Sequence, residues 1–276
     1  MHTLLSPAKV NLFLAITGKR KDGYHNLVSL FHTINLFDIF EIKETQNFNI
    51  KIFGKYFKDI PANEENLIYK VKCLFEKKTN KKINFSIKLY KNIPPFKGLG
   101  GGSSNAAIFL KFLNEYFDEP LSESNIKEIL LKVGSDTLFF YKATCALVTG
   151  RGEKVYPLSP LKGDLYIYLP NIKVSTKEAY KAIKEYDNLS ENKALSIYKL
   201  LKENFPKEHN KSLFFNTFEK VNLPSINYLK NITSNFSKVT LSGSGSSLFS
   251  VEDIDILKVE KIKVSFLDSK FRYNIS

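Results

Sequence analysis

The alternation of apolar and polar residues predicts a strand-rich first half of the chain. Residues 83–90 place apolar side chains at every second position, which is the pattern of a half-buried strand. Similar runs predict strands at 10–16, 28–34, 38–43, 48–53, 144–149 and 153–158. Helical patterns predict one helix from Asn66 to Lys78, an apolar helix from Ala106 to Phe117, and a helix that begins after Ser122 and ends at Gly134.

The second half mixes strands and helices without regular alternation. Strands are predicted at 165–169, 238–241, 248–251 and 261–266, and helices at 177–187, 192–204, 211–221 and 225–234. This mixture indicates an α+β fold. The stretch Tyr156–Asp164, rich in turn residues, is the best boundary, so we expect domains at 1–156 and 157–276.

Composition narrows the class of protein. With 276 residues and 43% hydrophobic content, the chain is expected to be globular and not disordered. No run of about 18 apolar residues is present, and the N-terminus lacks a secretory signal pattern, so we expect a cytoplasmic protein without a membrane partner. Cys73 and Cys145 are interpreted as core residues in a reducing compartment. The net charge of +13 is spread along the chain, which favours a solvated basic surface over a nucleic-acid site.

A glycine-rich stretch between a strand and a helix is the main chemical signal. Residues 94–107 read Pro-Pro-Phe-Lys-Gly-Leu-Gly-Gly-Gly-Ser-Ser-Asn-Ala-Ala. A strand, a glycine loop and a helix N-terminus together form an anion site, because free N–H groups and the helix dipole favour phosphate. The spacing is neither that of a P-loop nor that of a dinucleotide fingerprint. A flexible linker is the alternative interpretation.

Three motifs resemble those of the GHMP kinase superfamily. The glycine-rich stretch resembles its ATP-binding motif; Ser-Pro-Ala-Lys-Val-Asn-Leu at 6–12 and Leu-Ser-Gly-Ser-Gly-Ser-Ser at 241–247 agree in order. The resemblance implies a two-lobed fold with the active site in the cleft between lobes, and an ATP- and Mg²⁺-dependent kinase. The start of the chain, together with Asp-Gly-Tyr-His at 22–25, is similar to kinases that phosphorylate the 2-hydroxyl of a cytidine-diphosphate-linked methylerythritol in the non-mevalonate isoprenoid pathway.

The resemblance also assigns catalytic and ATP-binding residues. Asp136, in Gly-Ser-Asp-Thr, matches the catalytic base, and Lys9 matches its partner; the family's Val-Pro after the aspartate is Thr137-Leu138 here. Taken alone, Asp136 would be interpreted as a solvated turn residue and Lys9 as a surface lysine. No carboxylate pair predicts a metal site in the protein, so Mg²⁺ is expected on phosphate oxygens, water and Ser103. The expected ATP-binding residues are Pro94, Pro95, Phe96, Lys97, Gly98, Leu99, Gly100, Gly101, Gly102, Ser103, Ser104, Asn105 and Asn66, the last of which could instead start a helix.

The resemblance implies a cytidine site as well. Tyr24 would stack on cytosine, His25 would hydrogen-bond its edge, and Tyr180 would cover its other face. The remaining expected substrate contacts are Asn11, Thr176, Gly243 and Ser244. Without the resemblance, residues 24–25 and 243–245 would be interpreted as ordinary turns.

Two other functions remain open. One is a GHMP kinase of the mevalonate or homoserine type, and the other is a basic nucleic-acid-binding protein. The expected partner is a small-molecule substrate, with no nucleic acid, and the expected state is a monomer or weak homodimer.

Overall fold

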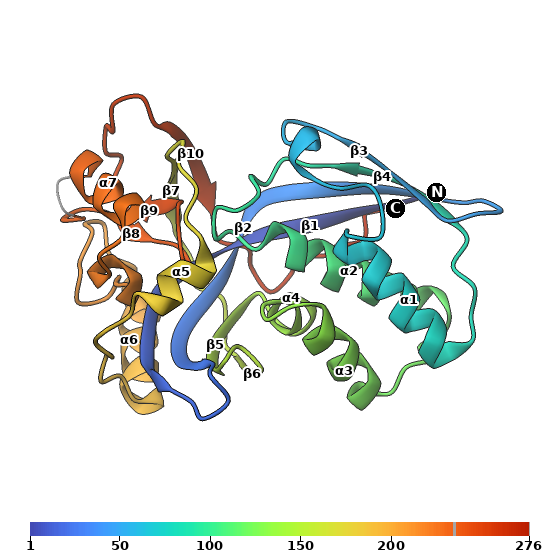
Figure 1. Ribbon diagram of the computed structural model, residues 1–276, viewed down its shortest axis with the longest axis horizontal. Coiled ribbons are helices and arrows are strands. Elements are labelled where there is room, and N and C mark those ends of the chain that lie inside the picture. The colour runs from blue at the N-terminus through green and yellow to red at the C-terminus, as the bar shows by residue number, and fades with distance from the viewer. Residues whose placement is uncertain (234–235, 276) are drawn as a thin grey trace.

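Two β-sheets organise the molecule (Figure 1). The structure is a computed structural model and describes residues 1–233 and 236–275. The larger sheet has the order β3-β4-β2-β5-β6, with β1 paired to β2, and the smaller has the order β10-β7-β9-β8. Their bounds are β1 (His2–Lys19), β2 (His25–Glu44), β3 (Asn49–Phe53), β4 (Phe85–Tyr90), β5 (Cys145–Gly150), β6 (Lys154–Pro157), β7 (Asp164–Leu169), β8 (Thr240–Leu241), β9 (Leu248–Ser250) and β10 (Glu260–Ser265). This architecture confirms the predicted α+β class.

The helices are divided between the two sheets. One face of the larger sheet is covered by α1 (Leu67–Thr79), α2 (Gly101–Tyr116), α3 (Glu123–Val133) and α4 (Thr137–Lys142) (Figure 1). The other half contains α5 (Thr176–Lys181), α6 (Glu191–Glu203) and α7 (Pro224–Ile232). Short 3₁₀ turns are η1 (Phe57–Asp59) and η2 (Thr217–Lys220). The apolar residues of α2 from Ala106 to Leu113 are buried, which fixes this central helix against the sheet.

Two helix boundaries follow from the capping residues that the sequence contains. The Ser122 hydroxyl accepts from Asn125 N at 3.3 Å and begins α3, and Gly134 ends it by donating to Leu130 O at 3.0 Å. Asn66 begins α1, because its side chain accepts from Ile68 N at 3.0 Å. These predicted boundaries are confirmed.

The predicted helix at 211–221 is wrong. Leu14 N donates to Phe215 O at 2.8 Å, and Leu14 forms a parallel bridge with Asn216, so this part of the segment is extended. Only η2 is helical there, as a single 3₁₀ turn. Contact with a strand 200 residues earlier overrides the local pattern, and no local periodicity contains that information.

Other predictions need smaller corrections. Helix α5 ends at Lys181, so the predicted helix at 177–187 is too long, and α4 is an additional helix. The predicted helix at 225–234 corresponds to α7, but residue 234 lies outside the described residues. Cys145 is buried as expected, whereas Cys73 is exposed on α1 and is not a core residue.

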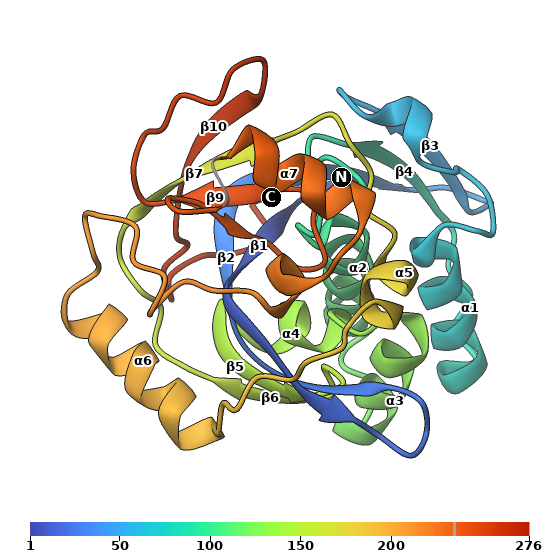
Figure 2. The ribbon, with the colours of Figure 1, turned by 60° about the vertical axis from the view of Figure 1, so that its left-hand side comes forward.

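The long strands β1 and β2 connect the two halves of the molecule (Figure 2). Along β1, Ile16 N donates to the Thr217 hydroxyl at 2.8 Å, so the end of the larger sheet is bonded directly to the second half. The C-terminal segment returns to the first half through bridges Leu4–Asn274 and Ile34–Phe266. Both strands also contribute residues to the lining of a cavity, Lys9, Asn11 and Leu14 from β1 and Leu27 and Phe31 from β2.

Candidate active site

Lys9 and Asp136, the predicted catalytic pair, lie together. Their Nζ and Oδ2 atoms are 3.7 Å apart. Lys9 lies in β1 between register shifts at Pro7/Ala8 and Asn11/Phe13, and such bulges re-aim side chains. Asp136 is the N-cap of α4, but its carboxylate makes no capping hydrogen bond, so it is available to face Lys9.

The ammonium group of Lys9 is buried in largely apolar surroundings. Only 2% of the residue is exposed, its ammonium donates to Asn11 Oδ1, and it lies 4.6 Å from the centre of the Phe31 ring. Burial lowers the pKa of Lys9, and the Asp136 carboxylate opposes this by favouring the ammonium. An ammonium with few water neighbours stabilises nearby negative charge more strongly than a solvated one.

The glycine-rich stretch supplies the N-terminus of α2. Gly100 is the N-cap with φ of +75°, and Gly101, Gly102 and Ser103 occupy the first turn. Ser104 N donates to Gly100 O at 2.9 Å, so the three N–H groups before it have no carbonyl within the helix. The predicted start of this helix at Ala106 is wrong by about one turn. Residues Gly101–Ser104 are helical and present an anion-binding end.

The second glycine segment, residues 242–247, packs directly against the first. A Cβ atom on Gly98 would lie 2.2 Å from Ser242 O, and Gly98 has φ of +72°, so only glycine fits here. Ser247 N donates to Lys97 O at 3.3 Å, and Lys97 Nζ donates to Ile172 O at 2.8 Å. Lys97, predicted as an ATP contact, therefore joins the two halves of the molecule.

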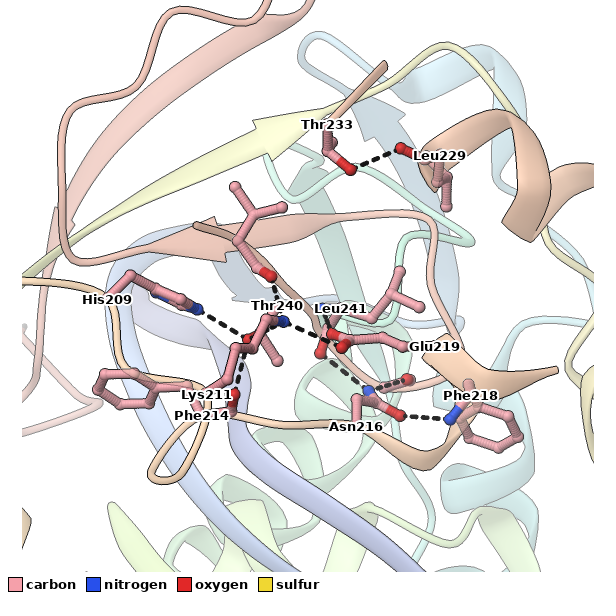
Figure 3. Close-up of polar contacts among 12 residues, drawn as sticks. His209, Lys211, Phe214, Asn216, Phe218, Glu219, Leu229, Thr233, Thr240 and Leu241 are labelled. Carbon is pink, nitrogen blue, oxygen red and sulfur yellow. Dashed lines mark hydrogen bonds and ion pairs between the residues drawn. The ribbon is translucent and has the colours of Figure 1, made fainter. Parts of the chain in front are cut away.

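A polar cluster formed by Asn216, Glu219 and Lys211 holds the second glycine segment and the strand residue before it in place (Figure 3). The Asn216 amide donates to Leu241 O and to Gly243 O, both at 2.8 Å. Leu241 N donates to the Glu219 carboxylate at 2.9 Å, and Lys211 pairs with the same carboxylate at 2.9 Å. Burial raises the pKa of Glu219 and lowers that of Lys211, while their mutual attraction opposes both shifts.

A cavity of about 280 Å³ lies between the two glycine segments and the predicted catalytic pair. The structure brings five predicted substrate-site residues to its lining, and the Thr176 and Ser244 hydroxyl oxygens are 2.7 Å apart. Those five residues are Asn11, Thr176, Tyr180, Gly243 and Ser244. Asn11 is fixed on both sides, since its amide donates to the Ser29 hydroxyl at 3.0 Å and its carbonyl accepts from Lys9.

Of the aromatic residues predicted to bind cytosine, Tyr180 lines this cavity, whereas Tyr24 and His25 are not among its lining residues. The His25 ring centre is 5.2 Å from that of Tyr180, and burial, then Lys19, lower the pKa of His25. Tyr24 is 56% exposed, and the guanidinium carbon of Arg151 lies 5.0 Å from its ring centre. One face of the Tyr24 ring is therefore already in contact with a cation.

Besides Lys97, two predicted ATP contacts have their polar atoms engaged elsewhere. Asn66 uses its carbonyl as the α1 cap, and its amide donates to Pro61 O at 2.8 Å. Asn105 is buried below the first turn of α2, where its amide donates to the Ser6 hydroxyl at 2.9 Å. Phe96 is exposed with φ of +58°. Pro94 is buried and Pro95 is half-buried in the same loop.

Sequence reasoning missed several residues that line the cavity. Arg151 lies between Gly150 and Gly152 in the turn that joins β5 and β6. A cation between two glycines is a weak sequence signal for a binding site, but it was available. Phe31 and Phe218 gave no usable signal, because apolar residues in strands and turns usually serve the core. Within the described residues, no group of three or more potential metal-ligating side chains occurs. Among the residues that the structure describes, none of the helices has the length and apolar character that a membrane span requires.

The fold and this site define a GHMP kinase: the family profile "GHMP kinases N terminal domain" matches residues 66–143. A 4-diphosphocytidyl-2-C-methyl-D-erythritol kinase of Persephonella marina is 41% identical over 198 residues, 71% of each chain. A kinase of the same name from Clostridium perfringens is 35% identical over 97% of this chain and 93% of its own. A crystal structure of a 4-(cytidine 5′-diphospho)-2C-methyl-D-erythritol kinase matches with TM-score 0.78 and 25% identity, covering 96% and 98% of the two chains. The chain belongs to the 4-diphosphocytidyl-2-C-methyl-D-erythritol kinase family and is a kinase that uses ATP.

Proposed function

We propose that the protein transfers the γ-phosphoryl group of ATP to the 2-hydroxyl of 4-(cytidine 5′-diphospho)-2-C-methyl-D-erythritol. The observation that carries the proposal is the Lys9–Asp136 pair, 3.7 Å apart, in a cavity bordered by both glycine segments. Membership of the family supports the choice of substrate.

Asp136 and Lys9 have complementary roles in this reaction. The substrate oxygen forms a bond to the γ-phosphorus while the bond from that phosphorus to the ADP oxygen breaks. Asp136 accepts the hydroxyl proton as the new bond forms. Lys9 forms an ion pair with Asp136 and stabilises the negative charge that develops on the transferring group. The apolar cover over Lys9, including the ring of Phe31, strengthens this effect.

The first turn of α2 binds the triphosphate in this proposal. Its N–H groups at Gly101–Ser103 and the helix dipole attract the phosphate oxygens. Mg²⁺ binds mainly through phosphates and water and needs few protein ligands, which fits a site without a group of metal-ligating side chains in the described residues. The Ser103 hydroxyl would be its protein ligand, and the ion would neutralise phosphate charge.

The cytidine end of the substrate binds between the aromatic side chains. Tyr180 and Tyr24 offer ring faces for stacking, and His25 offers ring nitrogens to the base edge. The Gly243–Ser244 turn, fixed by Asn216, lies where the substrate diphosphate would pass. The partners in this proposal are small molecules, the enzyme acts in the cytoplasm, and it acts as a monomer or weak homodimer. We place the domain boundary at 156/157, before the last residue of strand β6.

A substrate comparison tests the proposal. Purified protein is incubated with ATP, Mg²⁺ and 4-(cytidine 5′-diphospho)-2-C-methyl-D-erythritol, and ADP formation is followed, with mevalonate and homoserine as alternative acceptors. We expect turnover of the cytidine substrate and the 2-phosphate product by phosphorus NMR. Faster turnover of mevalonate or homoserine would overturn the substrate assignment.

A further inference from the structure

The loop between β4 and α2 is attached at both ends to one buried carboxylate, Asp38 of β2. At the entrance to the loop, Asp38 Oδ1 accepts from Asn92 N at 2.8 Å and from Ile93 N at 2.9 Å. Beyond the loop, Asp38 Oδ2 accepts from the Asn105 amide at 3.0 Å. The same oxygen accepts from the ammonium of Lys91, which lies at the entrance. The glycine-rich segment 94–104 therefore starts and ends at the same side chain.

The connection continues into the first turn of α2. Lys91 Nζ also donates to Asn105 Oδ1 at 3.0 Å, and the Asn105 amide donates to the Ser6 hydroxyl. That hydroxyl in turn donates to the Ser104 hydroxyl at 2.8 Å. The network thus joins β1, β2, the end of β4 and α2, and each polar side-chain atom in it has a partner.

This arrangement is costly for stability alone. Asp38 is 0% exposed and Lys91 is 2% exposed, so both charges have lost their water. Burial lowers the pKa of Lys91, and the neighbouring carboxylate opposes that shift. A buried ion pair usually contributes no more to folding than apolar residues of similar size would, because desolvation offsets the attraction. A role in function explains its presence better than a role in stability.

The position of the pair indicates what that role is. Lys91 Nζ lies 3.4 Å from where a Cβ atom of Gly101 would be, so the pair lies directly below the first residue of α2. We infer that Asp38 is a positioning residue that, through Lys91 and Asn105, holds the first turn of α2 in the geometry that binds the ATP phosphates. The inference rests on the proposed ATP site. Asp38 itself is fully buried, so it acts through Lys91 and Asn105.

Asp38→Asn tests the inference, because it keeps the shape of the side chain and removes its charge. We expect the Kd for a non-hydrolysable ATP analogue, measured by calorimetry, to rise about tenfold or more, since small misplacements of binding groups have effects of this size. The Kd for cytidine diphosphate should stay within about twofold. A purely structural role would lower the melting temperature and the active fraction and leave the KM for ATP unchanged.

The matched control is Glu41→Gln. Glu41 and Lys88 form an ion pair at 3.4 Å between the same strands, β2 and β4, but Lys88 is 54% exposed. This variant should leave ATP binding unchanged. Since analogue binding needs no acceptor alcohol, the experiment gives an answer even if the proposed substrate is not turned over.

The double variant Asp38→Asn/Lys91→Met separates positioning from direct contact. It removes both charges, and the new amide at position 38 can donate to the Asn105 carbonyl that Lys91 releases. We expect it to regain most of the lost melting temperature and ATP affinity. If the double variant is stable but binds the analogue as weakly as Asp38→Asn, Lys91 itself contacts the nucleotide and the inference is overturned. Unchanged ATP affinity in a folded Asp38→Asn variant would also overturn it.

Discussion

Replacing Gly102 by alanine tests whether a phosphate binds at the first turn of α2. A Cβ atom here would meet Leu67 Cδ1 at 3.7 Å, which is an ordinary van der Waals contact. Alanine in place of a helical glycine stabilises by roughly 0.5–1 kcal/mol in a helix interior, and less near the end. Taking about 0.5 kcal/mol, the melting temperature of the free protein should rise by about 1–2 °C.

The same methyl group should weaken ATP binding, because it lies beside N–H groups that a phosphate must approach closely. We expect the Kd for ATP to rise about tenfold, equivalent to about 1.4 kcal/mol. Calorimetry measures the Kd, and thermal unfolding without ligand measures the stability. Gly98→Ala is the contrasting variant. Its Cβ would lie 2.2 Å from Ser242 O, so it should lose stability even without ATP. If Gly102→Ala kept its stability and bound ATP like the parent protein, phosphate would not approach this turn.

Three further predictions concern chemistry, recognition and pH. Asp136→Asn should leave ATP affinity nearly unchanged and lower kcat by about 10²-fold or more, and an unchanged kcat would remove Asp136 as the base. Tyr24→Ala should raise the KM for the cytidine substrate by about 5- to 150-fold, the equivalent of roughly 1–3 kcal/mol of stacking, while the KM for ATP stays constant; the reverse pattern would exchange the two nucleotide sites. Burial lowers the pKa of His32 to about 4. The folded protein therefore binds fewer protons than the unfolded chain between pH 6.5 and 4, and stability should fall by up to about 3 kcal/mol as pH drops through that range. His32→Gln should flatten this part of a plot of melting temperature against pH, and an unaltered slope would contradict the assignment.

The sequence predicts the site better than it predicts the second half of the fold. The three motifs carried the resemblance to the GHMP kinases, and that resemblance implied that Lys9 and Asp136 act as a pair; their charged atoms lie 3.7 Å apart. Their catalytic roles stay predictions, as does the domain boundary at 156/157. A helix cap such as Ser122 depends only on residues close to it in the sequence, so the start of α3 could be predicted from the sequence.

What could not be predicted depends on distant contacts. Residues 215–216 are extended because they contact Leu14 of β1, and Asn105 is withdrawn from the ATP side because Asp38 and Ser6 bind it from two other strands. Asp38 looked like any polar residue in a strand. Its importance is visible only once the loop ends are seen to converge on it.

The direct bonding of β1 to the second half bears on how the molecule opens. Leu14 N and Ile16 N donate to residues 215 and 217, and Ile16 O accepts from Asp187 N at 2.8 Å. Rotation of one half against the other would break this ladder, so access to the cavity should depend on local loop fluctuations and not on a hinge. The amide protons of Leu14 and Ile16 should then exchange with solvent deuterium only when the whole chain unfolds, and the two halves should denature in one cooperative step.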